Sequence, residues 1–158
     1  MAEGTLQIRE ANPEDVPVLV DYNCRMARET EGLALDRPTV ERGVRAVFDD
    51  PARGFYLVAV VNDRVAGQLM VTFEWSDWRD GMIYWIQSVY VAPEFRRSGV
   101  FTALYQYLQQ LARRRGVVGI RLYVEQENAN AQRTYERLGM RLSHYRLMEQ
   151  MIGREGKA

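Results

Sequence analysis

The sequence predicts a single α/β domain in which helices cover both faces of a central, mixed and mostly antiparallel sheet. Three observations lead to this fold class. The chain of 158 residues has the length of one domain. Apolar residues make up 47% of it, which is enough to bury a core without disulfides. Segments that alternate like strands and segments with helical spacing follow one another along the chain, as they do in mixed folds.

The first half of the chain is expected to contain a strand, two helices and a hairpin. Asn12 is a good helix cap and Pro13 suits the first helical position, so a helix should start there. The dense apolar run that begins at Phe55 and the segment after it are expected to pair around the turn-like Asn62-Asp63. The elements predicted in this half are, in order, residues 6–10, 13–30, 39–48, 55–61 and 65–75.

The second half is expected to alternate strands and helices. Val100, Leu104, Leu108 and Leu111 lie on one face at helical spacing, and Gly116 should end their helix. A further helix should run from a cap at Asn128 to Gly139. The predicted strands are residues 82–91, 120–124 and 140–148, and residues 153–158 are expected to be a frayed tail of the domain 1–158.

Charge and residue usage exclude several classes of function. Lys and Arg together number 21, as do Asp and Glu, and the net charge of zero argues against a nucleic-acid-binding or membrane-binding protein. Cys24 is the one cysteine and His144 the one histidine, so neither a disulfide nor a metal site is expected. The N-terminal residues do not resemble a signal peptide and no stretch is long and apolar enough to span a bilayer. We therefore expect a cytoplasmic protein.

The segment from Val89 to Phe101 joins a strand to a helix through a proline and a basic loop. The first amides of a helix lack partners, and the helix dipole favours anions there. Gly99 allows close approach of the backbone to a ligand, and Arg96 and Arg97 add positive charge. The loop has neither the lysine of a Walker motif nor the three glycines of a dinucleotide fingerprint. It predicts a pyrophosphate site; the alternative is an ordinary loop with solvated arginines.

A second segment, Asn128 to Met140, places Tyr135 two turns into a short helix, on the face shared with Ala131 and Leu138. Taken alone, such a tyrosine is more often a core residue. Together with Val91-Ala92-Pro93 and the run from Arg96 to Phe101, this segment resembles the GNAT N-acetyltransferase superfamily. The signatures of that superfamily are V-x-P followed by Q/R-x-x-G-x-G/A, and N-x-x-A-x-x-x-Y-x-x-x-G-M. Both occur here in the expected order and on the expected elements.

The resemblance implies an enzyme that uses acetyl-CoA as co-substrate. The backbone around Val89 and Val91 would pair with the pantetheine arm, and Asn128 or Asn130 would touch it. Tyr135 would protonate the departing thiolate, and the amine would attack the thioester directly, with proximity supplying much of the rate. The pyrophosphate would lie on the loop residues Arg96, Arg97, Ser98, Gly99, Val100 and Phe101.

The sequence departs from the family pattern at two positions. Phe101 replaces a small residue and is expected to point into the core. Gln87 lies where many members carry a catalytic glutamate, and a glutamine cannot act as a base. We expect Glu74, among aromatic neighbours that would lower the local dielectric constant, to take the proton from the amine. The alternatives are a solvated Glu74, a Glu74 that only binds a cation, and a water chain in which Gln87 orients the amine or a water.

The acceptor is expected to be a small-molecule amine, with a cationic molecule favoured by clustered acids. Glu29 and Glu31 break the preference against acids at a helix C-terminus, which can mark function, although a solvated helix end is the equal alternative. Trp75 would add a cation–π contact. The resemblance also implies a homodimer, for which the last strand is the expected contact edge. The competing function is a non-catalytic acyl-CoA-binding regulatory module, which Gln87 favours and Tyr135 opposes.

Overall fold

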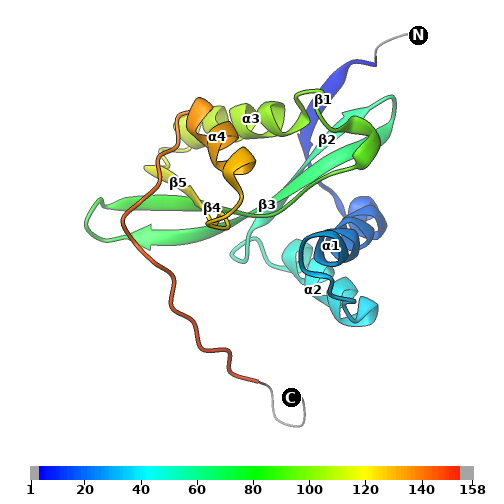
Figure 1. Cartoon of the computed structure of the whole chain (residues 1–158), viewed down its shortest axis with the longest axis horizontal. Coiled ribbons are helices and arrows are strands. Elements are labelled where there is room, and N and C mark those ends of the chain that lie inside the picture. Colours follow the sequence, from blue (N-terminus) through cyan, green and yellow to red (C-terminus); the bar gives the residue numbers. More distant parts are fainter. Residues whose placement is uncertain (1–3, 154–158) are drawn as a thin grey trace. The chain divides into compact units, whose positions relative to one another are not determined.

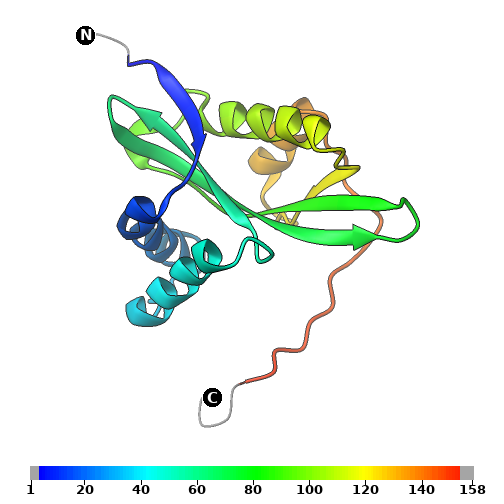
Figure 2. The same cartoon turned by 180° about the vertical axis from the view of Figure 1, so that it is seen from behind.

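The computed structural model describes residues 4–153, and a five-stranded sheet organises most of them (Figures 1 and 2). The strands are β1 (Leu6–Glu10), β2 (Phe55–Val61), β3 (Arg64–Ser76), β4 (Gly81–Val91) and β5 (Gly119–Leu122), and they lie side by side in this order. Neighbouring strands are antiparallel except β4 and β5, which are parallel. The predicted mixed, mostly antiparallel sheet is confirmed.

The helices are α1 (Val16–Glu31), α2 (Arg37–Asp49), α3 (Val100–Arg114) and α4 (Ala129–Arg137). Short 3-10 turns at Pro13–Asp15 and Pro93–Phe95 precede α1 and α3. The chain divides into two compact units, with the boundary between Tyr123 and Val124. The assignment of residues 1–158 to one domain stays a prediction, and the expected frayed tail lies outside the described residues from position 154 onward.

The first unit contains the sheet with helices on both of its faces. In Figures 1 and 2, α1 and α2 lie on one side of the sheet and α3 on the other. Leu19 of α1 and Val47 of α2 pack with Tyr56 and Val58 of β2. On the opposite face Gly67 lies against Val100 of α3, where an added Cβ would come within 2.9 Å of the valine side chain. Because β2 is covered on both sides, its residues are apolar without alternation.

The start of α1 is fixed by a capping box and an ion pair. The Asn12 side chain accepts a hydrogen bond from the Glu14 amide, and Asp15 accepts one from the Asn12 amide. Arg9 of β1 donates two hydrogen bonds to the same Asp15 carboxylate, at 2.7 and 2.9 Å. Burial alone would raise the pKa of Asp15, but these hydrogen bonds outweigh it and hold the pKa below its ordinary value. The predicted start at Pro13 is therefore a 3-10 turn that leads into α1.

The second unit contains α4 and an extended C-terminal segment. As predicted, Asn128 caps the helix, since its side chain accepts a hydrogen bond from the Ala131 amide at 3.1 Å. The strand predicted over Met140–Met148 is wrong: residues 140–152 form neither helix nor strand, and His144 lies in this irregular segment. A strand needs a neighbour that pairs with its backbone groups, and alternation in sequence does not supply one.

Candidate functional site

Strand β4 has two halves with different neighbours. Its first half, up to Ile86, pairs with β5 on one side and with β3 on the other. From Gln87 to Val91 it pairs with β3 alone, and no other strand in residues 4–153 covers its second edge. The amide and carbonyl groups of an uncovered strand edge can pair with an extended ligand. The predicted contact residues Val89 and Val91 lie in this uncovered half.

A bulge interrupts β4 between these halves. The register moves from Gln68–Tyr90 to Met70–Gln87, so that one extra residue of β4 is accommodated, and Ser88 has a left-handed φ of 53°. The fully buried Gln68 side chain donates from Nε2 to the Ser88 carbonyl at 3.0 Å. Because an extra residue shifts the alternation of side chains, Tyr90 lies on the same face as Gln87, the face that α1 covers.

The loop between β4 and α3 ends in two left-handed residues, Arg97 at φ 63° and Gly99 at φ 79°. Gly99 is the N-cap of the 15-residue α3 and provides no side-chain hydrogen bond to the first turn. An added Cβ on Gly99 would meet no described atom within 4 Å. The first turn of α3 thus receives no acceptor from a cap side chain and lies at the positive end of the helix dipole, an arrangement that favours phosphate groups.

Arg96, at the start of this loop, is held by three groups of the protein. Its Nε donates to the Val91 carbonyl at 2.9 Å, and its Nη2 donates to Glu29 Oε2 of α1 at 2.9 Å. Its guanidinium lies over the Tyr90 ring, 5.4 Å from the ring centroid. Glu29, predicted to contact an acceptor, is therefore bound to the residue predicted to contact the pyrophosphate.

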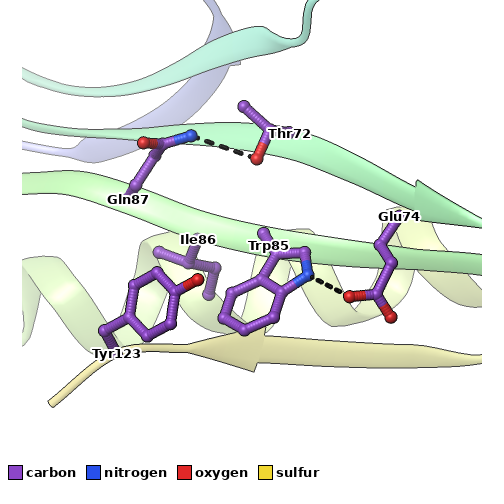
Figure 3. A pocket seen from close by; sticks show the side chains of 6 residues that line it. All are labelled: Thr72, Glu74, Trp85, Ile86, Gln87 and Tyr123. Atoms are coloured by element: carbon purple, nitrogen blue, oxygen red, sulfur yellow. Dashed lines mark hydrogen bonds between the residues drawn. The ribbon is translucent and has the colours of Figure 1, made fainter. Parts of the chain in front are cut away.

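A cavity of about 270 Å³ opens on the face of the sheet that carries α1 and α2 (Figure 3). Met70 of β3 packs against these helices, and the cavity lies farther along β3, where Thr72 and Glu74 follow on the same face. Thr72, Glu74 and Trp85 lie at alternate positions on β3 and β4 and therefore share this face. Gln87 donates to Thr72 Oγ1 at 3.0 Å. The cavity is lined by Thr72, Glu74, Trp85, Ile86, Gln87 and Tyr123.

Glu74 receives a hydrogen bond on each carboxylate oxygen. Trp85 donates from Nε1 to Oε1 at 3.0 Å, and Arg121 of β5 donates from Nη1 to Oε2 at 2.6 Å. The Trp85 ring in turn contacts Tyr123, with ring centroids 4.6 Å apart. Figure 3 shows Trp85 between Tyr123 and Glu74. The cavity therefore offers one anchored carboxylate beside an aromatic wall and a pair of polar side chains, Thr72 and Gln87.

The other predicted substrate-binding residues do not line this cavity. Trp75 is 59% exposed and, as the neighbour of Glu74 on β3, points to the opposite face. Glu31 is exposed at the end of α1. Of the adjacent Tyr84 and Trp85, Tyr84 packs in the core against Phe55 and Phe73, as the alternation predicts. Phe101 is half-buried and stacks on Tyr105 with ring centroids 6.1 Å apart.

The remaining predicted residues lie in the second unit. Asn128 caps α4, and Asn130 is exposed and accepts a hydrogen bond from Arg133. Tyr135 lies in α4, and burial raises the pKa of its hydroxyl. A raised pKa keeps this phenol protonated at neutral pH, as the role of a proton donor requires.

Arg121 and Tyr123 were not found by sequence reasoning. They lie two residues apart at the end of a short predicted strand, which places them on one face, and this alternation was the available signal. Nothing in the sequence indicates that this face meets Glu74, because β5 reaches β4 through the long crossover that contains α3.

Two negative findings apply to residues 4–153. No helix there is long and apolar enough to cross a membrane. No group of three His, Cys, Asp or Glu side chains in this part of the chain is placed to hold a metal ion.

The sequence is similar to known acetyltransferases. The model of the acetyltransferase (GNAT) family matches residues 21–140. A thialysine N-epsilon-acetyltransferase from Caenorhabditis elegans is 29% identical over 98 residues, which make up 62% of this chain and 59% of that relative. The match thus spans less than two thirds of the relative.

Solved structures with the same fold cover nearly the whole chain. A possible acetyltransferase from Clostridium difficile 630 has a TM-score of 0.87 and 43% identity, over 94% of this chain and 99% of that one. A predicted acetyltransferase from Clostridium acetobutylicum, solved with acetyl-CoA, has a TM-score of 0.73 and 18% identity, over 92% of this chain and 96% of that one. The second likeness shows the fold alone.

Proposed function

The chain belongs to the acetyltransferase (GNAT) family, and we propose that it transfers an acetyl group from acetyl-CoA to a primary amine of a small molecule. The family match confirms the resemblance stated from the two motifs and the acetyltransferase class that they predicted. The observation that carries the proposal is the uncovered half of β4, which leads directly into the open N-terminus of α3.

We propose that acetyl-CoA binds along this path. The pantetheine amides would pair with the backbone of β4 around Val89, and the pyrophosphate would lie on the amides of residues 97–101. The Val91 carbonyl already accepts a hydrogen bond from Arg96, and the Ser88 carbonyl accepts one from Gln68, so the backbone groups available to a ligand narrow toward Gln87 and Val89. In the second unit, Asn128 and Asn130 are the proposed pantetheine contacts.

The proposed reaction is a direct attack in a ternary complex. The nitrogen of the neutral amine attacks the thioester carbonyl carbon, an N–C bond forms, and the C–S bond breaks as the tetrahedral intermediate collapses. The nitrogen loses one proton to a base. The departing CoA sulfur takes one proton from the Tyr135 hydroxyl, which burial keeps protonated until that step.

Glu74 is the proposed base. An alkyl ammonium has a pKa near 10 and must lose a proton before it attacks. A carboxylate has about four lone-pair sites. The hydrogen bonds from Trp85 and Arg121 use two of them, so Glu74 keeps lone pairs that can accept a proton from the amine. A water held by Gln87 and Thr72 is the alternative route for the proton.

The proposed acceptor carries a cationic amine on a small molecule. Glu74 would attract the ammonium group, and the faces of Trp85 and Tyr123 would bind the adjoining carbons. The C. elegans relative, whose name states that it acetylates thialysine, supports an amine of this kind. Glu29, Glu31 and Trp75 lie outside the cavity. That they contact the acceptor is proposed only from the acidic cluster at the helix end and the aromatic residues noted in the sequence.

A homodimer is also proposed. Large apolar side chains of the C-terminal segment are exposed, and exposed apolar side chains are a feature of interaction sites. These side chains are Leu142, Tyr145, Leu147, Met148, Met151 and Ile152.

The test is CoA thiol release from acetyl-CoA with a panel of amines, comparing the wild type with Tyr135→Phe. We expect turnover with at least one class of amine, and a loss of about 100-fold in kcat for Tyr135→Phe with unchanged CoA affinity, because only the proton donor is removed. Tight binding of acetyl-CoA with no turnover on any amine of the panel would favour the non-catalytic acyl-CoA-binding module instead.

A further inference from the structure

We propose that Arg96 is a positioning residue, not a phosphate ligand: it braces the loop 93–99 against Glu29 of α1, and this brace sets the affinity for CoA. The brace (Glu29, Tyr90 and Arg96) is defined by contacts within the first unit. Only the identity of the ligand whose affinity it controls rests on the proposed function.

The contacts of Arg96 fix its guanidinium from three sides. The Val91 carbonyl, the Glu29 carboxylate and the Tyr90 ring belong to β4 and α1, so the start of the loop is tied to two elements at once. Charge-assisted hydrogen bonds of this kind are stronger and more directional than neutral ones. These two hydrogen bonds use two of the five N–H donors and fix the plane of the guanidinium toward Glu29.

Tyr90 completes the brace. Its hydroxyl donates to Glu29 Oε1 at 3.1 Å, so that both carboxylate oxygens of Glu29 are engaged. Its ring packs on Tyr22 with ring centroids 5.0 Å apart, and the Tyr22 hydroxyl donates to the Val65 carbonyl of β3. Burial, and then the hydrogen bond to Glu29, raise the pKa of Tyr90, so its hydroxyl remains a donor at neutral pH. The bulge at Ser88 is what turns Tyr90 toward α1.

The loop needs such a support because its shape is locally unfavourable. Arg97 is a non-glycine residue in the left-handed region, an arrangement that costs about 1 kcal/mol and persists where neighbouring structure holds it. The N-cap Gly99 contributes no side-chain hydrogen bond. The loop is held by Arg96, by a hydrogen bond from Ser98 to the Phe95 carbonyl, by an ion pair between Glu94 and Arg64 of β3, and by Phe95, which packs against Tyr22 and Tyr90. Of these contacts, the one that Arg96 makes with Glu29 ties the loop to the end of α1.

The two roles of Arg96 predict opposite effects of Glu29→Gln. If Arg96 bound the pyrophosphate, Glu29 would compete for the guanidinium and repel the ligand, and its neutralisation would strengthen CoA binding. If Arg96 is a brace, the same change loosens the loop and weakens CoA binding although a repelling charge has been removed. The sign of the change therefore separates the two roles.

The experiment measures the CoA dissociation constant of the full chain by calorimetry, together with hydrogen exchange of the loop 93–101 without CoA. For Glu29→Gln we expect a dissociation constant about three- to tenfold higher, and faster exchange. KM for acetyl-CoA should rise with little change in kcat, because the loss is in binding. Arg96→Lys should be as impaired as Arg96→Gln, since lysine keeps the charge but not the planar fork. Glu41→Gln, which breaks an exposed pair with Arg45 on α2, is the matched control and should change neither readout.

Tighter or unchanged CoA binding in Glu29→Gln would overturn the brace, as would an Arg96→Lys variant with wild-type affinity. Both variants replace half-exposed side chains, and thermal melting would verify that they fold. A wild-type protein that fails to bind CoA would contradict the proposed function. In that event hydrogen exchange decides on the brace: faster loop exchange in Glu29→Gln supports it, and unchanged exchange overturns it.

Discussion

The cavity beside Glu74 and the brace contain the same chemical unit in two different places. In the cavity, Glu74 accepts hydrogen bonds from Arg121 and from the indole of Trp85. In the brace, Glu29 accepts hydrogen bonds from Arg96 and from the hydroxyl of Tyr90. Both carboxylates are about equally exposed, at 39% and 44% of the side chain.

The difference lies in what surrounds each pair. Glu74 lines an open cavity, so a ligand can reach its free lone pairs, whereas Glu29 links a helix end to a loop and is not among the residues that line this cavity. A half-exposed ion pair of this kind contributes about 0–1 kcal/mol to the free energy of unfolding. Substitutions in either pair should therefore change kinetic constants more clearly than stability. In the proposed roles, it is the position of the carboxylate, and not its hydrogen-bond partner, that separates Glu74 as a base from Glu29 as a positioning residue.

The largest expected effect is that of Glu74→Gln. The change keeps the shape of the side chain and its place beside Trp85 but removes the base, so kcat/KM for the amine should fall about 100-fold. KM for acetyl-CoA should stay unchanged, which is the reverse of the pattern expected for Glu29→Gln. Steady-state kinetics with both substrates varied would measure this. If the two variants gave the same pattern, the functional separation of the pairs would be wrong.

A third arginine–carboxylate pair, Arg9 with Asp15, should act on stability alone. The Asp15 side chain is only 9% exposed, so Asp15→Asn should lower the free energy of unfolding by about 2 kcal/mol at neutral pH. Because the pKa of Asp15 is lowered by folding, its contribution is complete above the ordinary value of 3.8 and is lost as the pH falls through the lower folded value.

Urea unfolding of the wild type and Asp15→Asn between pH 7 and pH 2 would show the difference shrinking toward acid. A constant difference across this range would mean that packing, and not charge, is what the substitution removes. Glu29→Gln and Glu74→Gln, measured alongside, should each change the unfolding free energy by less than about 1 kcal/mol.

Gly99→Ala is expected to have a smaller effect. It tests the proposed pyrophosphate site at the N-terminus of α3 and leaves both ion pairs unchanged. Gly99 and Gly116 both have left-handed φ angles, 79° and 70°, and open space at the added Cβ. Either substitution to alanine should therefore cost about 1 kcal/mol of stability. CoA affinity should fall about tenfold in Gly99→Ala only, since the methyl group would stand where the pyrophosphate approaches α3. Calorimetry with CoA would decide, and equal affinities in the two variants would place the pyrophosphate elsewhere.

The parts of the fold that were predicted correctly depend on local signals. The Asn12 and Asn128 caps, the turn at Asn62-Asp63 and the strand-to-helix passage before Val100 are all specified by neighbouring residues, and each is present in the structure. The last strand failed for the opposite reason. Its alternation is real, but a strand forms only against a partner edge, and no local pattern supplies that edge.

The candidate site divides in the same way. The sequence by itself determined the part of the site that the backbone forms, which is the loop between β4 and α3. This part depends on contiguous residues: a proline and a basic loop, then Gly99 directly before an amphipathic helix, whose first turn therefore has no cap side chain. Only the tertiary structure decided which side chains meet. Arg121 reaches Glu74 across 47 positions of sequence, and Arg96 reaches Glu29 across 67. The first contact depends on the register of β4 with β3 and β5, and the second on one inserted residue at Ser88, which sets the face that later side chains of β4 occupy.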